Sequence, residues 1–261
     1  MVPSQKINTK EIFVTAKTKM ATRVQDDQPR RKGVLDLRAP GLLAKWPIIG
    51  LSMFIFGSLM FGALTYNLLA HGPLLQWDRT LATTLPAIGL RSPAALKPIM
   101  AAGFYLGKEV IMVLDILLAL YFIYKKYWQE LAMVTIGWTG SALLFYCLST
   151  FIDRARPPTM IWIIVSIPGF PSGHAVATVT FYGLLAYLLV PKISSSFWKA
   201  LVVAGALLII GFVGFSRIFT GGHYLTDILA GYAVGIAWSG AVYTLIEIYF
   251  QKRRIQNVKK E

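Results

Sequence analysis

The sequence predicts an all-α protein, a six-transmembrane helical bundle with an additional interfacial helix after the first span. Hydrophobic residues make up 56% of the 261 positions and charged residues only 15%. Soluble domains average roughly 45–50% and 25%, so this chain has more apolar surface than one water-soluble core can bury. Lys and Arg gather at the ends of long apolar runs, a distribution typical of membrane topology.

The apolar runs define the spans, since a transmembrane helix needs about 20 mostly apolar residues. Lys108, Glu109 and Asp115 interrupt the second run, so its ends are the least defined. Between the first and second runs, Trp77–Leu90 alternates polar and apolar residues at helical spacing, a pattern typical of a helix lying along the membrane interface. The six predicted spans are Trp46–Ala70, Pro98–Tyr124, Leu131–Ile152, Gly173–Pro191, Ala200–Ser216 and Ile228–Ile246.

The distribution of Lys and Arg predicts the orientation. Residues 1–45 hold ten of them and no apolar stretch long enough for a signal-peptide core, so this segment is predicted to be a basic cytoplasmic tail. Residues 251–261 form a second basic tail, and 46–250 form the membrane core. With both tails inside, 19 Lys and Arg lie on the cytoplasmic side and 7 outside. This asymmetry predicts cytoplasmic termini in a plasma (inner) membrane protein.

The same orientation places three segments on the periplasmic or exterior side: 71–97, 153–172 and 217–227. Within the second of these, Thr159–Phe170 is strongly apolar, but flanking prolines make it too broken to span. It is predicted either to dip into the interface beside a lipid tail or to be a buried structural loop.

Several other functions are disfavoured by composition. The net charge of +14 would suggest nucleic-acid binding only if the cations formed a stripe on a soluble face, so no nucleic-acid partner is expected. Cys147 is the single cysteine, which rules out an intramolecular disulfide. The carboxylates do not cluster, so no metal site is predicted.

Five polar residues are predicted to converge on the outside face. His174 and His223 fall at the outer ends of the fourth and sixth spans, beside Arg156 and Arg217. Asp227 follows His223 by four residues, which places both on one face of a helix. Taken singly, each has a structural explanation, such as a snorkelling Arg, an Asp helix cap or an interfacial His. Together they indicate an anion site, because ionisable groups at membrane depth are costly and usually functional.

These residue types suit phosphoryl transfer. Two guanidinium groups orient and neutralise phosphate oxygens, and free N–H groups at a helix start add donors. A histidine attacks phosphorus when a carboxylate holds its other ring nitrogen. A second histidine protonates the leaving oxygen and then activates water.

Three sequence blocks resemble the signatures of the type 2 phosphatidic acid phosphatase superfamily. The first is Asp153-Arg-Ala-Arg-Pro-Pro158, and the second is Pro171-Ser-Gly-His174. The third, Ser216-Arg-Ile-Phe-Thr-Gly-Gly-His-Tyr-Leu-Thr-Asp227, has the family spacing of Ser-Arg, five residues, His, three residues, Asp. Together they extend the resemblance over about residues 46–250.

The resemblance implies a role for each matching position. His223 would be the nucleophile that forms a phosphohistidine, Asp227 its hydrogen-bond partner, and His174 the general acid and then base. The family needs no metal or other cofactor, so none is expected here. The implied substrate-binding residues are Arg156, Arg217, Pro171, Ser172, Gly173 and, at the position discussed next, Ser149.

The chain departs from the family at Ser149. The family's first block usually begins with a lysine seven residues before the Arg of Arg-Pro, and that position here is Ser149. A serine donates a hydrogen bond but brings no positive charge. An active enzyme is favoured, since the other implied catalytic groups are present, but a catalytically impaired lipid-binding relative is the alternative.

The expected partners are membrane lipids and a lipid phosphate substrate. Polyprenyl pyrophosphate, phosphatidate, diacylglycerol pyrophosphate and phosphatidylglycerol phosphate all fit an outward-facing site. Transfer of the phosphate to a lipid or sugar acceptor instead of water is a further alternative, because water and an alcohol use the same base. The vanadium haloperoxidases have similar sequence motifs, but they are soluble proteins without transmembrane spans.

Overall fold

The structure is a computed structural model, and it describes residues 47–94, 96–158 and 167–258. Every regular element in these ranges is a helix. The predicted N-terminal tail and most of the apolar loop Thr159–Phe170 lie outside the described residues. The helices are α3 (Pro47–Leu69), α4 (Leu74–Arg91), α5 (Leu96–Gly107), α6 (Glu109–Lys125), α7 (Trp128–Ile152), α8 (Gly173–Leu189), the short 3₁₀ helix η1 (Val190–Lys192), α9 (Ser196–Phe219) and α10 (Leu225–Val258).

Five helices in the described ranges are long and apolar enough to cross a membrane. They confirm five of the six predicted spans, and four of them extend beyond the predicted edges. The last is helical to Val258, so most of the predicted C-terminal tail continues the helix. The five are Pro47–Leu69, Trp128–Ile152, Gly173–Lys192, Ser196–Phe219 and Leu225–Asn257.

The predicted second span is not confirmed as a single helix. It divides into α5 and α6 at Lys108, whose backbone angles of φ −143° and ψ −57° lie outside the helical region. Gly107 immediately precedes this break, and Glu109 begins the next helix. The two parts have 12 and 17 residues, each shorter than the length that crosses a bilayer.

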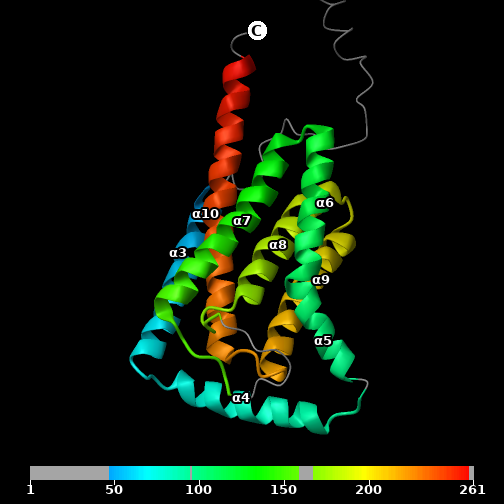
Figure 1. Cartoon of the computed structure of the whole chain (residues 1–261). Coiled ribbons are helices and arrows are strands. Elements are labelled where there is room, and N and C mark those ends of the chain that lie inside the picture. The colour runs from blue at the N-terminus through cyan, green and yellow to red at the C-terminus, as the bar shows by residue number, and fades with distance from the viewer. Residues whose placement is uncertain (1–46, 95, 159–166, 259–261) are drawn as a thin grey trace, which may run out of the picture. The chain divides into compact units, whose positions relative to one another are not determined.

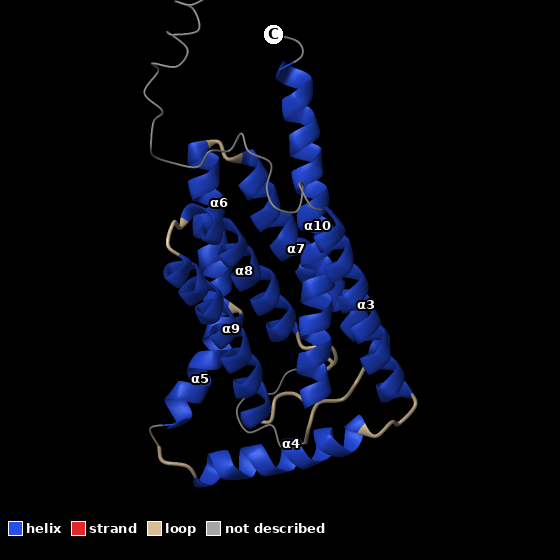
Figure 2. Ribbon diagram, turned by 180° about the vertical axis from the view of Figure 1, so that it is seen from behind, coloured by secondary structure: helices blue, strands red, loops and turns tan. Residues whose placement is uncertain are grey.

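Helix α10 is the centre of the bundle. It packs against α3, α7 and α8 (Figures 1 and 2). In its most apolar window 61% of the residues are buried, against 17% in α3. The outer helices instead expose large apolar side chains such as Phe56, Leu59 and Leu208. Surfaces of this kind are stable in lipid, where apolar contact carries no hydration penalty.

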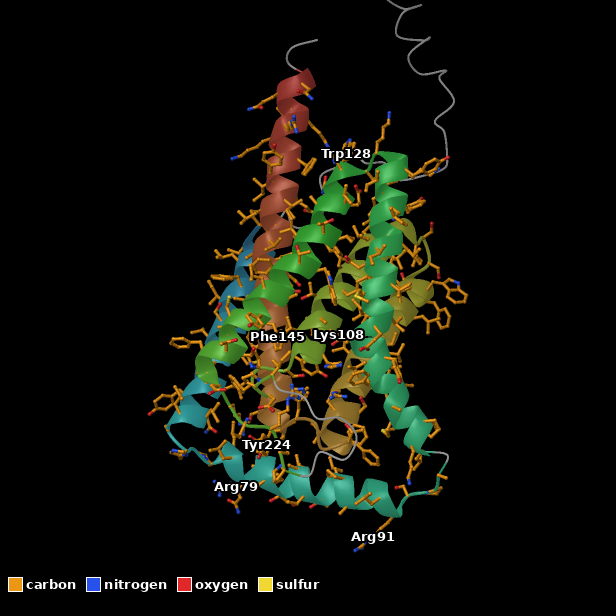
Figure 3. All side chains as sticks on the ribbon, viewed as in Figure 1. Arg79, Arg91, Lys108, Trp128, Phe145 and Tyr224 are labelled. Carbon is orange, nitrogen blue, oxygen red and sulfur yellow. The ribbon has the colours of Figure 1, made fainter. Side chains whose placement is uncertain are left out.

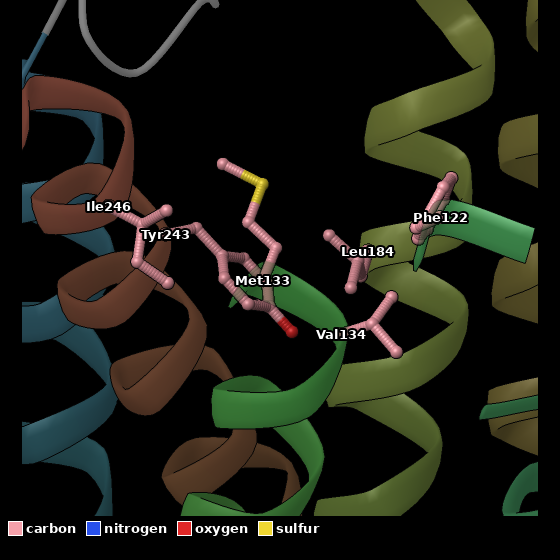
Figure 4. Close-up of a cluster of buried hydrophobic side chains, with 6 residues drawn as sticks. All are labelled: Phe122, Met133, Val134, Leu184, Tyr243 and Ile246. Atoms are coloured by element: carbon pink, nitrogen blue, oxygen red, sulfur yellow. The ribbon is translucent and has the colours of Figure 1, made fainter. Parts of the chain in front are cut away.

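A hydrophobic cluster packs the end of the bundle where α6 joins α7 (Figure 4). It brings together side chains from α6, α7, α8 and α10, and the Tyr243 hydroxyl donates to the carbonyl of Thr180 at 3.1 Å. The buried members of the cluster are Phe122, Met133, Val134, Leu184, Tyr243 and Ile246.

Helix α4 forms at the predicted interfacial segment and lies across the opposite end of the bundle (Figures 1 and 2). Leu81 and Leu85 pack against a buried cluster that includes Ile218 and Ile228. Arg79 and Arg91 point away from the bundle (Figure 3). Its position at the membrane interface stays a prediction.

Candidate active site

The five predicted catalytic and anion-binding residues come together at the α4 end of the bundle. Arg156 lies in the loop after α7, and His174 lies in the first turn of α8. Arg217 lies in the last turn of α9. His223 follows in the loop to α10, whose first turn contains Asp227. The site is therefore assembled from the ends of four helices, as the spacing of the motifs predicts.

The ring of His223 is held in one tautomer. Its Nδ1 lies 2.9 Å from the carbonyl oxygen of Gly169. A carbonyl only accepts hydrogen bonds, so Nδ1 carries the proton. Its Nε2 lies 3.0 Å from Nη1 of Arg156, which only donates, so Nε2 presents a lone pair. Both contacts require the same tautomer, and it leaves Nε2 as the nucleophilic nitrogen.

Asp227 supports this histidine in a different way from the one expected. Its Oδ2 lies 3.4 Å from Nδ1 of His223, farther than the Gly169 carbonyl, so the carboxylate is the secondary partner. The same Oδ2 accepts from the backbone N–H of Tyr224 at 2.9 Å. This contact caps α10, because the carboxylate at the third position of the helix accepts from the backbone N–H of the N-cap residue. Asp227 is thus both a helix cap and part of the histidine's surroundings.

A second carboxylate completes a buried network that the sequence did not reveal. Arg154 donates from Nη1 to Asp227 Oδ1 at 2.5 Å and from Nη2 to Asp78 Oδ2 at 2.8 Å. Asp78, on α4, also accepts from the backbone N–H of Thr226 at 2.9 Å. It is 1% exposed. This network ties α4 to the start of α10 and holds Asp227 in place.

The sequence carries little signal for the network. Asp78 lies within an amphipathic helix where a carboxylate ordinarily faces water, and it is 76 residues from Arg154. The position of Arg154 within the first block marked it as near the site. Its two-residue offset from Arg156 gives the two guanidinium groups different partners.

The two predicted phosphate-binding arginines differ in how they are held. Arg156 donates to the carbonyl oxygens of Ile167 and Gly222, both at 2.9 Å, besides its contact with His223. Arg217 is 5% exposed and stacks over the ring of Phe104, 4.9 Å from its centroid. Among the described residues its side chain has no hydrogen-bond or ion-pair partner, so its donors are available to an anion.

His174 lies beside Arg217 on the same aromatic support. Its ring centroid is 5.0 Å from that of Phe104. Its Nε2 is buried and has no hydrogen-bond partner among the described residues. A buried polar atom of this kind costs free energy unless a ligand or water meets it. His174 is therefore placed to exchange a proton with a bound substrate.

Of the remaining predicted binding residues, one lines the cavity and three do not. Gly173 is the first residue of α8 and lines the cavity. Pro171 and Ser172 are buried behind it, and the backbone N–H of Ser172 donates to the carbonyl oxygen of Asp227 at 2.9 Å. Ser149 is fully buried, and its hydroxyl donates to the carbonyl of Tyr146 within α7 at 3.1 Å. The structure thus does not bring Pro171, Ser172 or Ser149 to the cavity wall.

The site opens on a cavity of about 290 Å³. Its polar lining includes Lys108, Arg156, His174, Arg217 and His223. Its aromatic lining includes the α7 side chains of Trp138, Phe145 and Tyr146, with Phe104 of α5. A cavity lined by both cationic and aromatic side chains fits a ligand that joins an anionic group to an apolar one.

The surroundings of His223 keep its imidazole neutral. Burial lowers the pKa of His223 well below its ordinary value, and the positive charges of Arg156 and Arg217 lower it further. The hydrogen bond to Gly169 acts in the opposite sense but is smaller than these effects. Burial also lowers the pKa of the Arg156 guanidinium, while Asp227 raises it.

Comparison with known proteins identifies the family. The model of the PAP2 superfamily matches residues 108–250. The chain belongs to the PAP2 superfamily. Phosphatidylglycerophosphatase B of Bacillus subtilis is 29% identical over 190 residues, which cover 71% of this chain and 88% of that protein. Lipid A 1-phosphatase of Rhizobium etli is 26% identical over 200 residues, covering 62% and 82%.

A solved structure shares the architecture of this PAP2 protein. The crystal structure of the transmembrane PAP2-type phosphatidylglycerolphosphate phosphatase from Bacillus subtilis matches with a TM-score of 0.62 at 26% identity. The match covers 78% of this chain and 96% of that one. With five apolar helices and these relatives, this PAP2 protein is an integral membrane phosphatase, a phosphoric monoester hydrolase.

The Asp78 network makes a prediction for turnover. Asp78→Asn removes the charge that pairs with Arg154, so Asp227 is held less firmly. We expect kcat to fall about 10-fold, the scale of one lost hydrogen bond to a charged group, with KM little changed. Arg79→Gln, at the exposed neighbouring position of α4, is the control and should leave both constants unchanged. A purely structural role for Asp78 would instead lower thermal stability with kcat intact.

The electrostatics of His223 make a second prediction. Histidine-selective ¹³C NMR suits this chain, which has three histidines. Because the pKa of His223 is lowered, we expect its signal to keep the neutral form well below pH 6.5, where an ordinary histidine titrates. Arg156→Gln removes a positive charge, so the midpoint should move to higher pH. His71→Gln and His174→Gln assign the signals, and a His223 midpoint at 6.5 or above in the unsubstituted protein would contradict this account.

Proposed function

We propose that this PAP2 protein hydrolyses the phosphate or diphosphate headgroup of a membrane lipid through a phosphohistidine at His223, without a metal. The observation that carries the proposal is the lone pair on Nε2, presented at a cavity wall that also holds Arg156, Arg217 and His174. A nucleophile, an acid and two cations thus share one cavity. This arrangement supplies each group that phosphoryl transfer requires.

The reaction divides into two steps. In the first, Nε2 of His223 attacks phosphorus, the P–O bond to the lipid breaks, and His174 gives a proton to the leaving oxygen. In the second, neutral His174 takes a proton from water, whose oxygen attacks phosphorus. The P–N bond then breaks, inorganic phosphate leaves, and His174 is again protonated. Arg156 and Arg217 neutralise the charge on the equatorial oxygens in both steps.

Two features support a lipid as the substrate. The aromatic side chains of Trp138, Phe145 and Tyr146 line the same cavity as the cations and suit the first carbons of an acyl or prenyl chain. The names of the relatives refer to phosphatidylglycerophosphate and to the 1-phosphate of lipid A. We therefore propose a phosphorylated membrane lipid, with polyprenyl pyrophosphate, phosphatidate, diacylglycerol pyrophosphate and phosphatidylglycerol phosphate as the candidates to be compared.

The mechanism is tested by phosphate release from this lipid panel in detergent, with chelator present. We expect His223→Ala to abolish release and His174→Ala to lower kcat about 10²–10⁴-fold. His71→Ala is the matched control, because His71 is the third histidine and lies at the end of α3. Loss of activity with chelator would overturn the metal-free mechanism. Product analysis separates hydrolysis from transfer, since a transferase gives a phosphorylated acceptor in place of inorganic phosphate.

We also propose that the active site faces the periplasm or exterior and that both termini are cytoplasmic. The support is the excess of Lys and Arg on the predicted inner segments, 19 against 7. Cysteines placed at two exposed positions test it in a Cys147→Ser background. Arg91→Cys, on α4, should react with a membrane-impermeant maleimide in intact cells, and Ser194→Cys should react only after permeabilisation. The reverse labelling pattern would show the opposite orientation.

A further inference from the structure

Lys108 occupies a position in the fold that its sequence context does not reveal. It interrupts the second apolar run, between α5 and α6, and it lines the active-site cavity. Figure 3 labels Lys108 and Phe145, which both line this cavity. The non-helical backbone at Lys108 thus lies beside the phosphate site.

Close packing of α5 brings Lys108 to this place. A Cβ added at Gly103 would lie 2.2 Å from the hydroxyl of Ser216, and one at Gly107 would lie 2.8 Å from the ring of His174. Only glycine permits such an approach. Phe104, on the same helix, supports both His174 and Arg217. The residue after Gly107 is therefore held next to the acid and the phosphate-binding arginine.

The charge of Lys108 is not used elsewhere in the part of the chain that the structure describes. Its ammonium has no hydrogen-bond or ion-pair partner among those residues. The described lining of the cavity includes three permanent cations, Lys108, Arg156 and Arg217, and no carboxylate. Glu109 follows in sequence but does not line the cavity. Asp227 and Glu109 lie near enough to act on the charges of Arg156 and Arg217 from outside the cavity, but no carboxylate competes for the cations at the cavity surface, so an anion bound among them is favoured.

The positive charge that the family usually has at its first sequence block is missing at that position in this chain. The lysine expected at position 149 is a serine here, and that serine is buried with its hydroxyl bonded to Tyr146. Lys108 brings a positive charge to the cavity from the break between α5 and α6.

We propose that Lys108 binds the substrate's phosphate oxygens as the third cation of the site and supplies the charge that Ser149 lacks. This inference rests on the proposed function and adds a substrate-binding residue to it. A third cation also fits headgroups with more negative charge than a single phosphomonoester. The transferred phosphate then meets donors from three directions, from α5–α6, from the loop after α7 and from α9.

Competitive inhibition by inorganic phosphate tests the proposal on the full-length protein. Lys108→Gln should raise the inhibition constant about 10- to 100-fold, the effect of losing one charge-assisted hydrogen bond. It should lower kcat/KM on lipid phosphate by a similar factor. Lys108→Arg, which keeps the charge, should restore most of both values. Lys125→Gln, at the other end of α6 and far from the cavity lining, is the matched control and should match the unsubstituted protein.

A second readout does not depend on turnover. Inorganic phosphate should raise the thermal unfolding temperature of the unsubstituted protein, and this increase should be reduced in Lys108→Gln but kept in Lys125→Gln. If phosphate stabilises the protein in this way while no lipid phosphate is hydrolysed, the proposed function fails and the role of Lys108 stands. If lipid phosphate is hydrolysed and Lys108→Gln retains the phosphate affinity and kcat/KM of the unsubstituted protein within twofold, the role of Lys108 is wrong.

Discussion

The chemistry of this site depends on where one proton resides. The carbonyl of Gly169 holds the proton on Nδ1 of His223, and the guanidinium of Arg156 requires a lone pair on Nε2. Burial and neighbouring cations keep the ring neutral, so the proposed nucleophile needs no prior deprotonation step. The helix ends that form the site are arranged around this requirement, since each of them supplies a partner to the ring or a cation beside it.

Helix α4 is part of the candidate active site through a buried ion-pair network. Asp78 on α4 and Asp227 on α10 share the guanidinium of Arg154. The network contains two carboxylates and one guanidinium group, so it carries no excess of positive charge. In this it differs from the cavity lining, which is rich in cations. Arg154 and Arg156, two residues apart, therefore have different surroundings: Arg154 pairs with two carboxylates, and Arg156 lines the cavity that is proposed to bind the phosphate.

Much of the site could be predicted from sequence because its residues lie at fixed spacings on helix ends. His223 and Asp227 are four residues apart, and the outer ends of the spans were visible as limits of apolar runs. Long-range partners were not visible. Asp78 and Lys108 reach the site through the packing of α4 and α5, and local spacing does not encode that packing. The second predicted span is not confirmed as one helix for a local reason, since a charged break at Lys108, between Gly107 and Glu109, divides it into two helices.

The length of α10 has a consequence for the lipids around the enzyme. Asp227 and Lys252 are 25 residues apart on this one helix, about 38 Å at ~1.5 Å per residue. This exceeds the ~30 Å thickness of the hydrocarbon layer, so α10 is long enough for its Asp227 end and its basic end to reach opposite leaflets, as the proposed orientation requires. Dephosphorylation then removes negative charge from one leaflet only. The enzyme thereby changes the surface charge of a single face of the membrane, and its lipid product stays in that leaflet until it is moved across.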